Sequence, residues 1–515
     1  MDETEPLLAD VRLIDTERCD GVSHKDIVDF NVDGDAENPM EWPAAYKWGI
    51  VFLLSFMAFT VTFTCIAVVP IANQIVADLD DGRVSKSSSV LLVTIWELGE
   101  AAGPLLIAPL SEVFGRYPVM NGATILFVLA TALAAVSQST ALFIGARALT
   151  GLSVASNVLG PAIVGDMFAA EQRGSAISMI ALAPLIGGSL GPAIGGAMAE
   201  TLGWRSVLWL SAGLALACEL VFFTCFRETY KVAILRQRAA RLRAETGNPR
   251  LRTLFDVNDR QSRLHKVWEC AVRPAIVLSG SSVLQVMSLH GAVMFSYYYV
   301  FSTTLPDILQ QLYGLSAAAT GLAFIAFSES GFSAIYLAPL FHSHYLTRIA
   351  GAGSTISVIC LNVLLDKIYI KLREKHKGVG APEFRLPMCI VGGFSLPLAI
   401  TAYGWVAQMR LPLPVVMFSV GLFGTTLTLA YLPLNAYVVD AFGLYAASGM
   451  TAIIVARCLM STVLPLATDP LVSKFDWGLG LSVLGGIGLL IAPIPVLVFR
   501  YGSRWRQLSD YTKDS

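Results

Sequence analysis

The chain carries little charge for its length. Charged residues make up 14% of its 515 residues, whereas a typical soluble domain has about 25%. Hydrophobic residues make up 55%, and the mean hydropathy is +0.63. This composition is incompatible with an ordinary soluble protein and predicts one that crosses the lipid bilayer several times. The net charge of −2 gives no reason to expect a nucleic acid as partner.

The sequence also lacks the patterns of several catalytic and cofactor sites. Its eight cysteines include no C-x-x-C pair, so neither a disulfide framework nor a zinc site is indicated. It contains neither an H-E-x-x-H pattern nor a nucleotide-binding P-loop, which argues against a zinc protease and against ATP-driven transport. His342 and His344 are the only clustered histidines. We therefore predict no enzymatic activity, no metal and no cofactor.

About twelve long apolar stretches are present instead. Each approaches the roughly 20 residues that a helix needs to cross a bilayer, and a membrane β-barrel would show shorter alternating segments. The fold class is therefore predicted to be all-α integral membrane, with twelve transmembrane helices in two six-helix halves. The predicted spans are 48–70, 89–110, 119–137, 141–165, 176–199, 205–226, 278–301, an eighth within 321–365, 387–408, 413–437, 446–468 and 478–499.

Basic residues predict how these helices are oriented and divided. They are many in the segments expected in the cytosol and few in the expected outer loops, which places both termini inside by the positive-inside rule. The run Lys231 to Thr246 within the central linker has a helical pattern that could lie along the membrane surface. The predicted domains are a disordered cytosolic tail without a signal peptide (1–46), an N-terminal half (47–226), a basic cytosolic linker (227–273), a C-terminal half (274–500) and a cytosolic tail (501–515).

The stretch 321–365 does not fit this scheme simply, because it is too long for one span and polar residues interrupt it. Two spans would place the basic residues of 367–377 outside, against the positive-inside rule. We interpret the stretch as one span plus an extra segment around 332–350. That segment is either an insertion relative to related proteins or a gene-model artefact.

Two carboxylates lie within the second apolar stretch. Glu97 and Glu100 are three residues apart and would share one helix face. An acid at the centre of a bilayer costs roughly 2.5–3.5 kcal/mol even on a lenient scale, so a functional reason is expected. Arg147 in the fourth stretch needs a partner for the same reason, and these two acids are the nearest candidates in the sequence. Both a static ion pair and a pair that a proton opens and closes are consistent with these residues.

Two motifs carry a family resemblance. The loop after the second stretch resembles the G-x-L-x-D-R-x-G-R-R signature of the major facilitator superfamily, in the form typical of fungal drug:proton antiporters, although Val113 and Tyr117 replace two basic residues. The fifth stretch matches the G-x-x-x-G-P-x-x-G-G pattern of the antiporter branch. The two segments read Ala108-Pro109-Leu110-Ser111-Glu112-Val113-Phe114-Gly115-Arg116-Tyr117 and Gly187-Gly188-Ser189-Leu190-Gly191-Pro192-Ala193-Ile194-Gly195-Gly196.

Glycines at four-residue spacing let another backbone come close, and a proline inside a helix permits a bend. We therefore interpret the fifth helix as a gate at the interface of the two halves; plain helix packing is the alternative. Its motif residues are Gly187, Gly191, Pro192, Gly195 and Gly196. Shorter segments also resemble boundary signatures of the fungal antiporters: Asp35, Asn38-Pro39-Met40, Trp42, Glu228-Thr229-Tyr230 and Glu383 to Pro387. Arg457 resembles a residue of the eleventh helix in that branch.

The resemblance implies two further sites. A cytosolic charge cluster would latch the inner ends of the helices in one state, unless it is merely a surface salt bridge; its members would be Glu112, Gly115, Arg116, Asp166 and Arg173. Aromatic side chains on the seventh and tenth helices would line the substrate cavity, since they offer flat apolar faces with a polar tip. An aromatic belt at the membrane surface explains them equally well. The candidate cavity residues are His290, Tyr297, Tyr298 and Tyr431.

These observations together predict a proton-coupled secondary transporter that works by alternating access as a monomer. The expected activity is efflux of drugs, toxins or secondary metabolites, with a small amphipathic organic compound and protons as partners. The alternatives are an importer or polyamine or metabolite carrier of the same fold, a receptor without transport, and a membrane enzyme. The plasma membrane is the expected location; the acidic-dileucine pattern Glu3 to Leu8 leaves the vacuolar membrane as the alternative.

Overall fold

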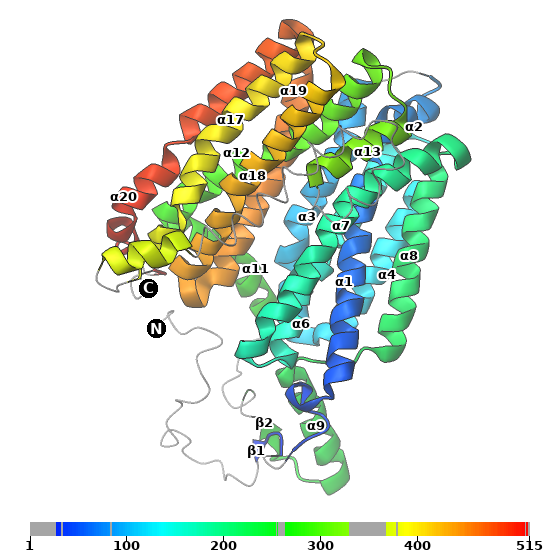
Figure 1. Cartoon of the computed structure of the whole chain (residues 1–515). Helices are drawn as coiled ribbons and strands as arrows, with labels where there is room; N and C mark the ends of the chain where they lie inside the picture. The colour runs from blue at the N-terminus through cyan, green and yellow to red at the C-terminus, as the bar shows by residue number, and fades with distance from the viewer. Residues whose placement is uncertain are drawn as a thin grey trace.

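The structure is a computed structural model that describes residues 27–31, 34–82, 85–253, 255, 263–328, 367–376, 380–509 and 511–512. Its long helices run roughly side by side in one bundle (Figure 1). The N-terminal segment, α9 and the C-terminal helix lie at one end, which we call the inner end; the opposite end is the outer end. The stretch 321–365, with its extra segment, lies outside the described residues from position 329 onward.

Eight helices precede the central linker and form what we call the N-terminal side. Ser85 begins α3 by accepting a hydrogen bond from the Ser88 amide, and Ser139 begins α5 in the same way with Leu142. Gly115 (φ 100°) separates α3 from α4, and Gly203 (φ 82°) separates α7 from α8. The helices are α1 (Ala44–Ile66), α2 (Ala72–Leu79), α3 (Lys86–Phe114), α4 (Arg116–Ala135), α5 (Thr140–Leu152), α6 (Ser156–Met167), α7 (Ala170–Leu202) and α8 (Trp204–Cys225).

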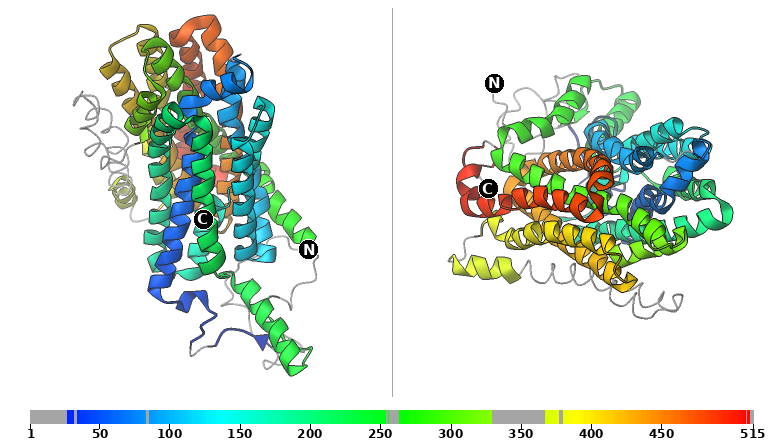
Figure 2. Two further views of the ribbon diagram at one scale, coloured as in Figure 1. Left: turned by 90° about the vertical axis from the view of Figure 1, so that its right-hand side faces the viewer. Right: turned by 90° about the horizontal axis from the view of Figure 1, so that it is seen from above.

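The helices after the linker form what we call the C-terminal side. Viewed from above, they gather opposite the N-terminal side (Figure 2). The helix α19 is broken at Asp476, whose φ of 60° and ψ of 175° are not helical, so the chain turns back there. The elements are α11 (Arg263–Gly280), α12 (Ser282–Asp307), η5 (Ile308–Leu312), α13 (Ala317–Ser328), α17 (Pro387–Gln408), α18 (Leu413–Phe442), α19 (Ala446–Ile491) and α20 (Ile494–Arg506).

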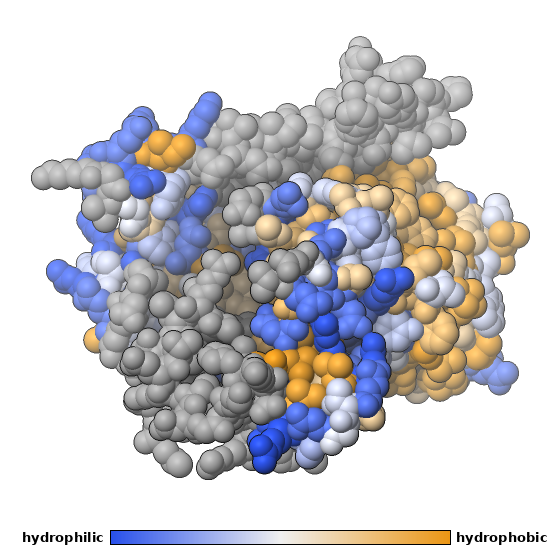
Figure 3. Space-filling model, turned by 90° about the horizontal axis from the view of Figure 1, so that it is seen from below, coloured by the Kyte–Doolittle hydropathy of each residue, from blue (hydrophilic) through white to orange (hydrophobic). Residues whose placement is uncertain are grey.

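In the described part of the chain, nine helices are long and apolar enough to cross a membrane, or ten if the bent pair Val267–Gly280 and Ser282–Leu312 is counted as one span. Large apolar side chains on their outer faces are exposed, such as Phe52 (61%), Leu129 (60%) and Leu220 (60%). Seen from the inner end, the flank of the bundle is largely hydrophobic while hydrophilic residues gather near the middle (Figure 3). This is the distribution expected of an all-α membrane protein.

A small folded unit at the inner end corrects the expectation of a tail that is disordered up to residue 46. The strand β1 (Ile27–Val28) pairs in parallel with β2 (Arg252–Thr253), and Asn38 caps the short helix η3 (Pro39–Glu41). The predicted helical run forms α9 (Lys231–Thr246), and its Leu235 is buried. The N-terminal segment therefore packs with the central linker over the described residues 27–31 and 34–46.

Two ion pairs tie chain ends to helices. Asp35 accepts a hydrogen bond from Arg238 of α9. Burial acts to raise the pKa of Asp35, but hydrogen bonds from Arg238 and from backbone amides, with the charge of Arg238, outweigh it and hold the pKa below its ordinary value. At the C-terminus, the guanidinium of Arg506 donates to both carboxylate oxygens of Glu383, at 2.9 and 3.2 Å.

Candidate functional site

A polar cluster lies in the middle of the bundle, where α3 meets the C-terminal side. Glu97 is only 2% exposed, and its Oε1 accepts a hydrogen bond of 2.6 Å from the hydroxyl of Tyr299 on α12. Its Oε2 has no hydrogen-bond partner among the described residues. The Sγ of Cys65 on α1 lies 3.9 Å from the same hydroxyl. A buried acid with one oxygen unpaired can take up a proton without breaking an ion pair.

The second acid of α3 faces a different partner. Glu100 Oε1 lies 3.6 Å from Nη2 of Arg457 on α19 and accepts a 3.2 Å hydrogen bond from the amide of Asn157 on α6. Its other oxygen accepts a 3.2 Å hydrogen bond from the indole of Trp96. The guanidinium of Arg457 also stacks over the ring of Phe295, 4.3 Å from its centroid. The two acids therefore connect α3 to α12 and α19 across the bundle.

The predicted pairing of Arg147 with these acids is wrong for this structure. Its guanidinium is buried and donates to the backbone carbonyls of Thr64 and Cys65 on α1, both at 2.8 Å. It also stacks on Trp96, with 4.7 Å from Cζ to the ring centroid. The α1 helix ends at Ile66, so its last carbonyls lack intrahelical partners and satisfy the cation instead. Arg147 therefore ties α5 to α1.

Part of the predicted inner charge cluster is present. Arg116 Nε lies 3.3 Å from Asp166 Oδ2, and the hydroxyl of Thr229 donates to the same oxygen at 3.3 Å. Glu228 accepts hydrogen bonds from the backbone amides of Arg116 and Tyr117, at 2.8 and 3.1 Å. Gly115 adopts a φ of 100°, a backbone conformation that residues with a Cβ rarely take, which explains why glycine is needed there.

The ring of Tyr230 completes this loop cluster. The guanidinium of Arg116 stacks on it, with 4.8 Å between Cζ and the centroid. Burial raises the pKa of the Tyr230 phenol to about 12, so this side chain stays neutral at physiological pH. The segment Glu228-Thr229-Tyr230 thus fastens the end of α8 to the α3–α4 loop and to α6.

Two predicted members of the cluster lie elsewhere, which corrects the prediction. Glu112 accepts a hydrogen bond from the thiol of Cys270 on α11, at 3.7 Å, and is not bonded to Arg116 or Asp166. Arg173 donates to the carbonyls of Phe168 and Gly165, at 2.9 and 2.7 Å, so it closes the end of α6. Arg116 and Asp166 contact each other and residues 228–230. All of these residues belong to the N-terminal side or to the segment that directly follows α8.

The glycine motif of α7 lies between two backbones. A Cβ on Gly187 would meet the carbonyl of Phe59 on α1 at 2.6 Å, and one on Gly195 would meet that of Ala67, the residue after α1, at 2.2 Å. Gly191 also faces α1. Gly196 lies against Ala317 of α13, while Gly321 of α13 packs on the carbonyl of Pro192. The helix therefore packs directly on both sides of the molecule.

The motif of α7 also contains the letters G-x-S-x-G from Gly187 to Gly191, which mark the nucleophile of some hydrolases. That pattern requires a sharp strand-to-helix turn. Ser189 instead lies inside a helix and donates to the carbonyl of Leu185 at 2.9 Å. Its surroundings are therefore those of a packed helix.

The four predicted cavity residues separate into two pairs. His290 is fully buried beside Cys389 of α17, 3.7 Å from its Sγ. Tyr297 is fully buried too and donates to the carbonyl of Leu484 at 2.6 Å. Both pack inside the C-terminal side, so their assignment to a cavity is corrected.

The other pair lies at the central cluster. Tyr298 stacks edge-on against Tyr299, with 5.1 Å between centroids, and Tyr431 of α18 packs against Phe295 at 4.8 Å. These aromatic side chains surround Arg457 and the acids of α3. Arg457 and Tyr299 were not predicted to contact the acids of α3; their signal was a polar residue within an apolar span, the same signal that identified Glu97.

A model of the Major Facilitator Superfamily matches residues 50–465 of this chain. The chain belongs to that superfamily. Its members are transporters, and the helical membrane architecture described above is in keeping with this. The chain is therefore a membrane-spanning transporter and not an enzyme.

Curated relatives and solved structures agree with this family. The chain is 32% identical to the efflux pump radE of Floropilus chiversii, covering 93% of this chain and 85% of radE. It is also 32% identical to the MFS transporter cpaT of Aspergillus oryzae, covering 93% and 91%. A crystal structure of a D-xylose-proton symporter aligns with a TM-score of 0.62 at 15% identity, covering 91% of this chain and 99% of that one.

Proposed function

We propose that this transporter exports drugs, toxins or secondary metabolites in exchange for protons, by alternating access. The observation that carries the proposal is the buried carboxylate of Glu97, hydrogen-bonded across the bundle to Tyr299. The similarity to an efflux pump supports export as the direction. The expected substrate is a small amphipathic organic compound, for which the aromatic side chains around Arg457 offer apolar faces.

The proposed architecture is twelve spans in two six-helix halves, 47–226 and 274–500, joined by the linker 227–273. The candidate span Ala446–Arg506 has 61 residues, about 90 Å of helix, three times the apolar thickness of a bilayer. Its break at Asp476 divides it into two crossings. Counting α12 as the seventh span and α13 as the start of the eighth gives twelve.

The proposed cycle uses the contacts that α3 makes across the bundle. As a carboxylate, Glu97 accepts the hydrogen bond from Tyr299 strongly; as a neutral acid it accepts more weakly, so protonation loosens α3 from α12. Glu100 and Arg457 form the second connection, which a polar group of the substrate would compete for. The drive is sufficient, because one charge moving through 100 mV is worth about 2.3 kcal/mol and each pH unit about 1.4 kcal/mol.

The inner ends are proposed to rearrange with this cycle. The Arg116–Asp166 pair and the Glu228 anchor keep the α3–α4 loop in one conformation on the N-terminal side. The glycine motif of α7 provides the close backbone surface along which the two sides rock. We propose that the protein acts as a monomer in the plasma membrane, with the vacuolar membrane as the alternative, which fluorescence microscopy of a tagged chain distinguishes.

The test is accumulation of a panel of dyes, drugs and polyamines in efflux-deficient yeast that expresses the chain, with and without a protonophore. We expect lower accumulation of at least one compound, abolished by the protonophore and by the double variant Glu97→Gln/Glu100→Gln. Glu219→Gln is the matched control, since Glu219 is a buried acid of α8 outside the central cluster. Transport that is unchanged in the double variant would refute the coupling role, and raised accumulation would indicate import.

A further inference from the structure

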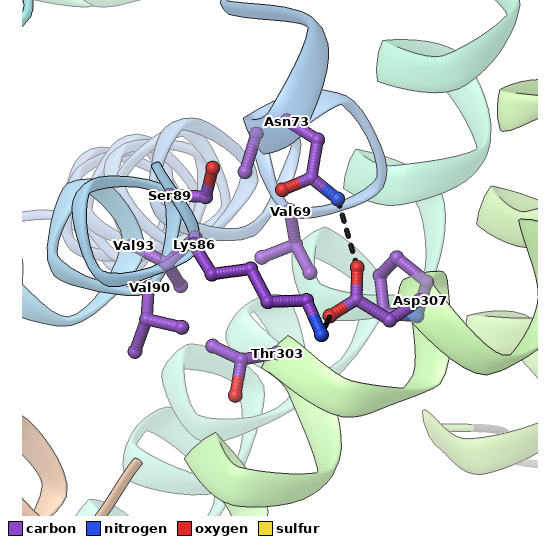
Figure 4. Close-up of a pocket in the computed structure, with 10 residues that line it drawn as sticks. Val69, Asn73, Lys86, Ser89, Val90, Val93, Thr303 and Asp307 are labelled. Carbon is purple, nitrogen blue, oxygen red and sulfur yellow. Dashed lines mark hydrogen bonds and ion pairs between the residues drawn. The ribbon is translucent and has the colours of Figure 1, made fainter. Parts of the chain in front are cut away.

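A charged cluster joins the two sides of the molecule at the outer end, far from the inner loop cluster. Lys86 is the first residue of α3, and its Nζ lies 3.9 Å from Asp307 Oδ2 at the end of α12. The same Nζ lies 3.7 Å from Asp469 Oδ1 on α19. Figure 4 shows the lysine side chain reaching across to Asp307. One cation is thus shared between two carboxylates of the opposite side.

Hydrogen bonds from uncharged side chains reinforce the same junction. The amide of Asn73 on α2 donates to Asp307 Oδ1 at 2.8 Å, as Figure 4 also shows. Close by, Gln310 donates from η5 to the carbonyl of Pro70 at 2.8 Å. The carboxylate of Asp307 is 13% exposed, so it depends on these partners more than a surface carboxylate would.

Between this junction and the central cluster, facing residues of α3 and α12 form a line that we call the seam. One face of α3 carries Lys86 and the residues 4, 7 and 11 positions after it, which are Val90, Val93 and Glu97. Val90, Val93 and Thr303 line a small cavity together with Lys86 and Asp307. Thr303 and Asp307 are four residues apart on α12, and Tyr299 is one further step down. The seam therefore spans roughly 16 Å, from Lys86 to the Tyr299–Glu97 hydrogen bond.

The position of this cluster differs from that of the inner one. The ion pairs that join the two sides include the two made by Lys86 and the pair of Arg457 with Glu100. The Arg116–Asp166 pair stays on the N-terminal side. In this conformation, charge holds the two sides together at the outer end and the centre.

We propose that Lys86, Asp307 and Asp469 form the outer gate of the transporter. When Lys86 releases both carboxylates, the outer ends of α3, α12 and α19 part, and the seam opens from outside to Glu97. This proposal depends on the proposed function in one respect only: the proposed function says that a proton enters from outside when the gate opens. Its opening and closing can be measured without transport.

The test uses Thr303→Cys as a reporter in the seam, in the full chain expressed in cells and treated from outside with a membrane-impermeant maleimide. Adding Lys86→Met should raise the labelling rate at this cysteine about fivefold, which corresponds to a partly exposed ion pair worth about 1 kcal/mol. Arg205→Met is the matched control, because Arg205 pairs with Asp78 at 2.9 Å at the same end but within the N-terminal side. This control should label at the unmodified rate.

If Lys86→Met fails to reach the membrane, a variant with the two charges exchanged tests the gate instead. Lys86→Asp/Asp307→Lys restores an opposite-charge pair and should label slowly, whereas Lys86→Asp alone should label fast. Equal labelling of Lys86→Met and Arg205→Met, or fast labelling of the exchange variant, would overturn the gate. Labelling that behaves as expected in a chain that exports nothing would refute the proposed function and leave the gate intact.

Discussion

At the residue scale, the structure shows that costly polar groups in the membrane region have specific partners. Glu97 has a phenol, Glu100 has a guanidinium and an amide, and Arg147 has two backbone carbonyls. The same holds at the inner loop, where Glu228 accepts four backbone hydrogen bonds, two from the loop and two from Thr229 and Tyr230. A carboxylate is suited to this because it offers two oxygens and no donor.

The anchoring role of Glu228 predicts a loss of stability in Glu228→Gln. An amide would point a donor at backbone N–H groups, leaving buried groups unsatisfied at a cost of about 1–3 kcal/mol. We expect a lower midpoint of thermal unfolding for the purified protein in detergent. Glu112→Gln is the control, because Glu112 lies nearby in the last turn of α3 and accepts no backbone hydrogen bond among the described residues. An equal shift in both variants would contradict the role.

At the element scale, helix packing depends on where side chains are absent. The α7 glycines bring its backbone against α1 and α13, whereas a Cβ placed on Gly213 of α8 would have no other atom within 4 Å. Substituting glycine therefore has opposite expected effects at two sites within spans. A side chain added to an α7 glycine forces two helices apart, whereas one added at Gly213 makes α8 less flexible.

We predict that Gly195→Leu abolishes correctly folded transporter, because even a Cβ there would come within 2.2 Å of the Ala67 carbonyl. Gly213→Ala should be neutral or stabilising by about 0.5–1 kcal/mol, since alanine is the better helix former. Size-exclusion profiles of fluorescent fusions in detergent measure both. A monodisperse Gly195→Leu protein would contradict the close approach of α7 to α1.

The unit formed by the N-terminal segment and α9 predicts a dependence on pH. Because the pKa of Asp35 in the folded protein is lowered below its ordinary value near 3.8, its pairing with Arg238 contributes fully above about pH 4 and is lost as the pH falls through the folded pKa. Limited proteolysis should therefore spare residues 27–42 at pH 7 and cut them more readily below pH 4. Arg238→Met should be cut readily at pH 7; protection of this variant would refute the contact.

At the scale of the whole molecule, the sequence located the apolar helices of the described residues better than it predicted the partners of their polar side chains. Apolar runs of about 20 residues located the helices because bilayer thickness fixes their length, and α9 has the predicted bounds. The partner of Arg147 was wrong because spacing along a helix says which face a residue lies on, not which neighbour that face meets. Arg457 lies far along the chain from Glu100, and Glu228 lies far from Arg116. No local sequence pattern could therefore predict these two contacts.

The contacts between the two sides predict that the molecule can be assembled from two chains. The sides meet through α7 with α13 and through α3 with α11, α12 and α19, while α9 pairs with the N-terminal segment. We expect fragments 1–253 and 254–515, expressed together, to purify as a complex and to restore transport. Neither fragment should transport alone; failure of the pair to associate would show that the linker itself holds the sides together.

The ion pair at the end of α20 limits how far the C-terminus can be shortened. Arg506 lies nine residues from the chain end and neutralises Glu383, which is 4% exposed and lies four residues before α17. Trimming the C-terminus past Arg506 would strand that acid without its cation, at a cost of about 3–5 kcal/mol. Any shortened version of the protein should therefore keep Arg506, because its guanidinium is the cation that this buried acid needs.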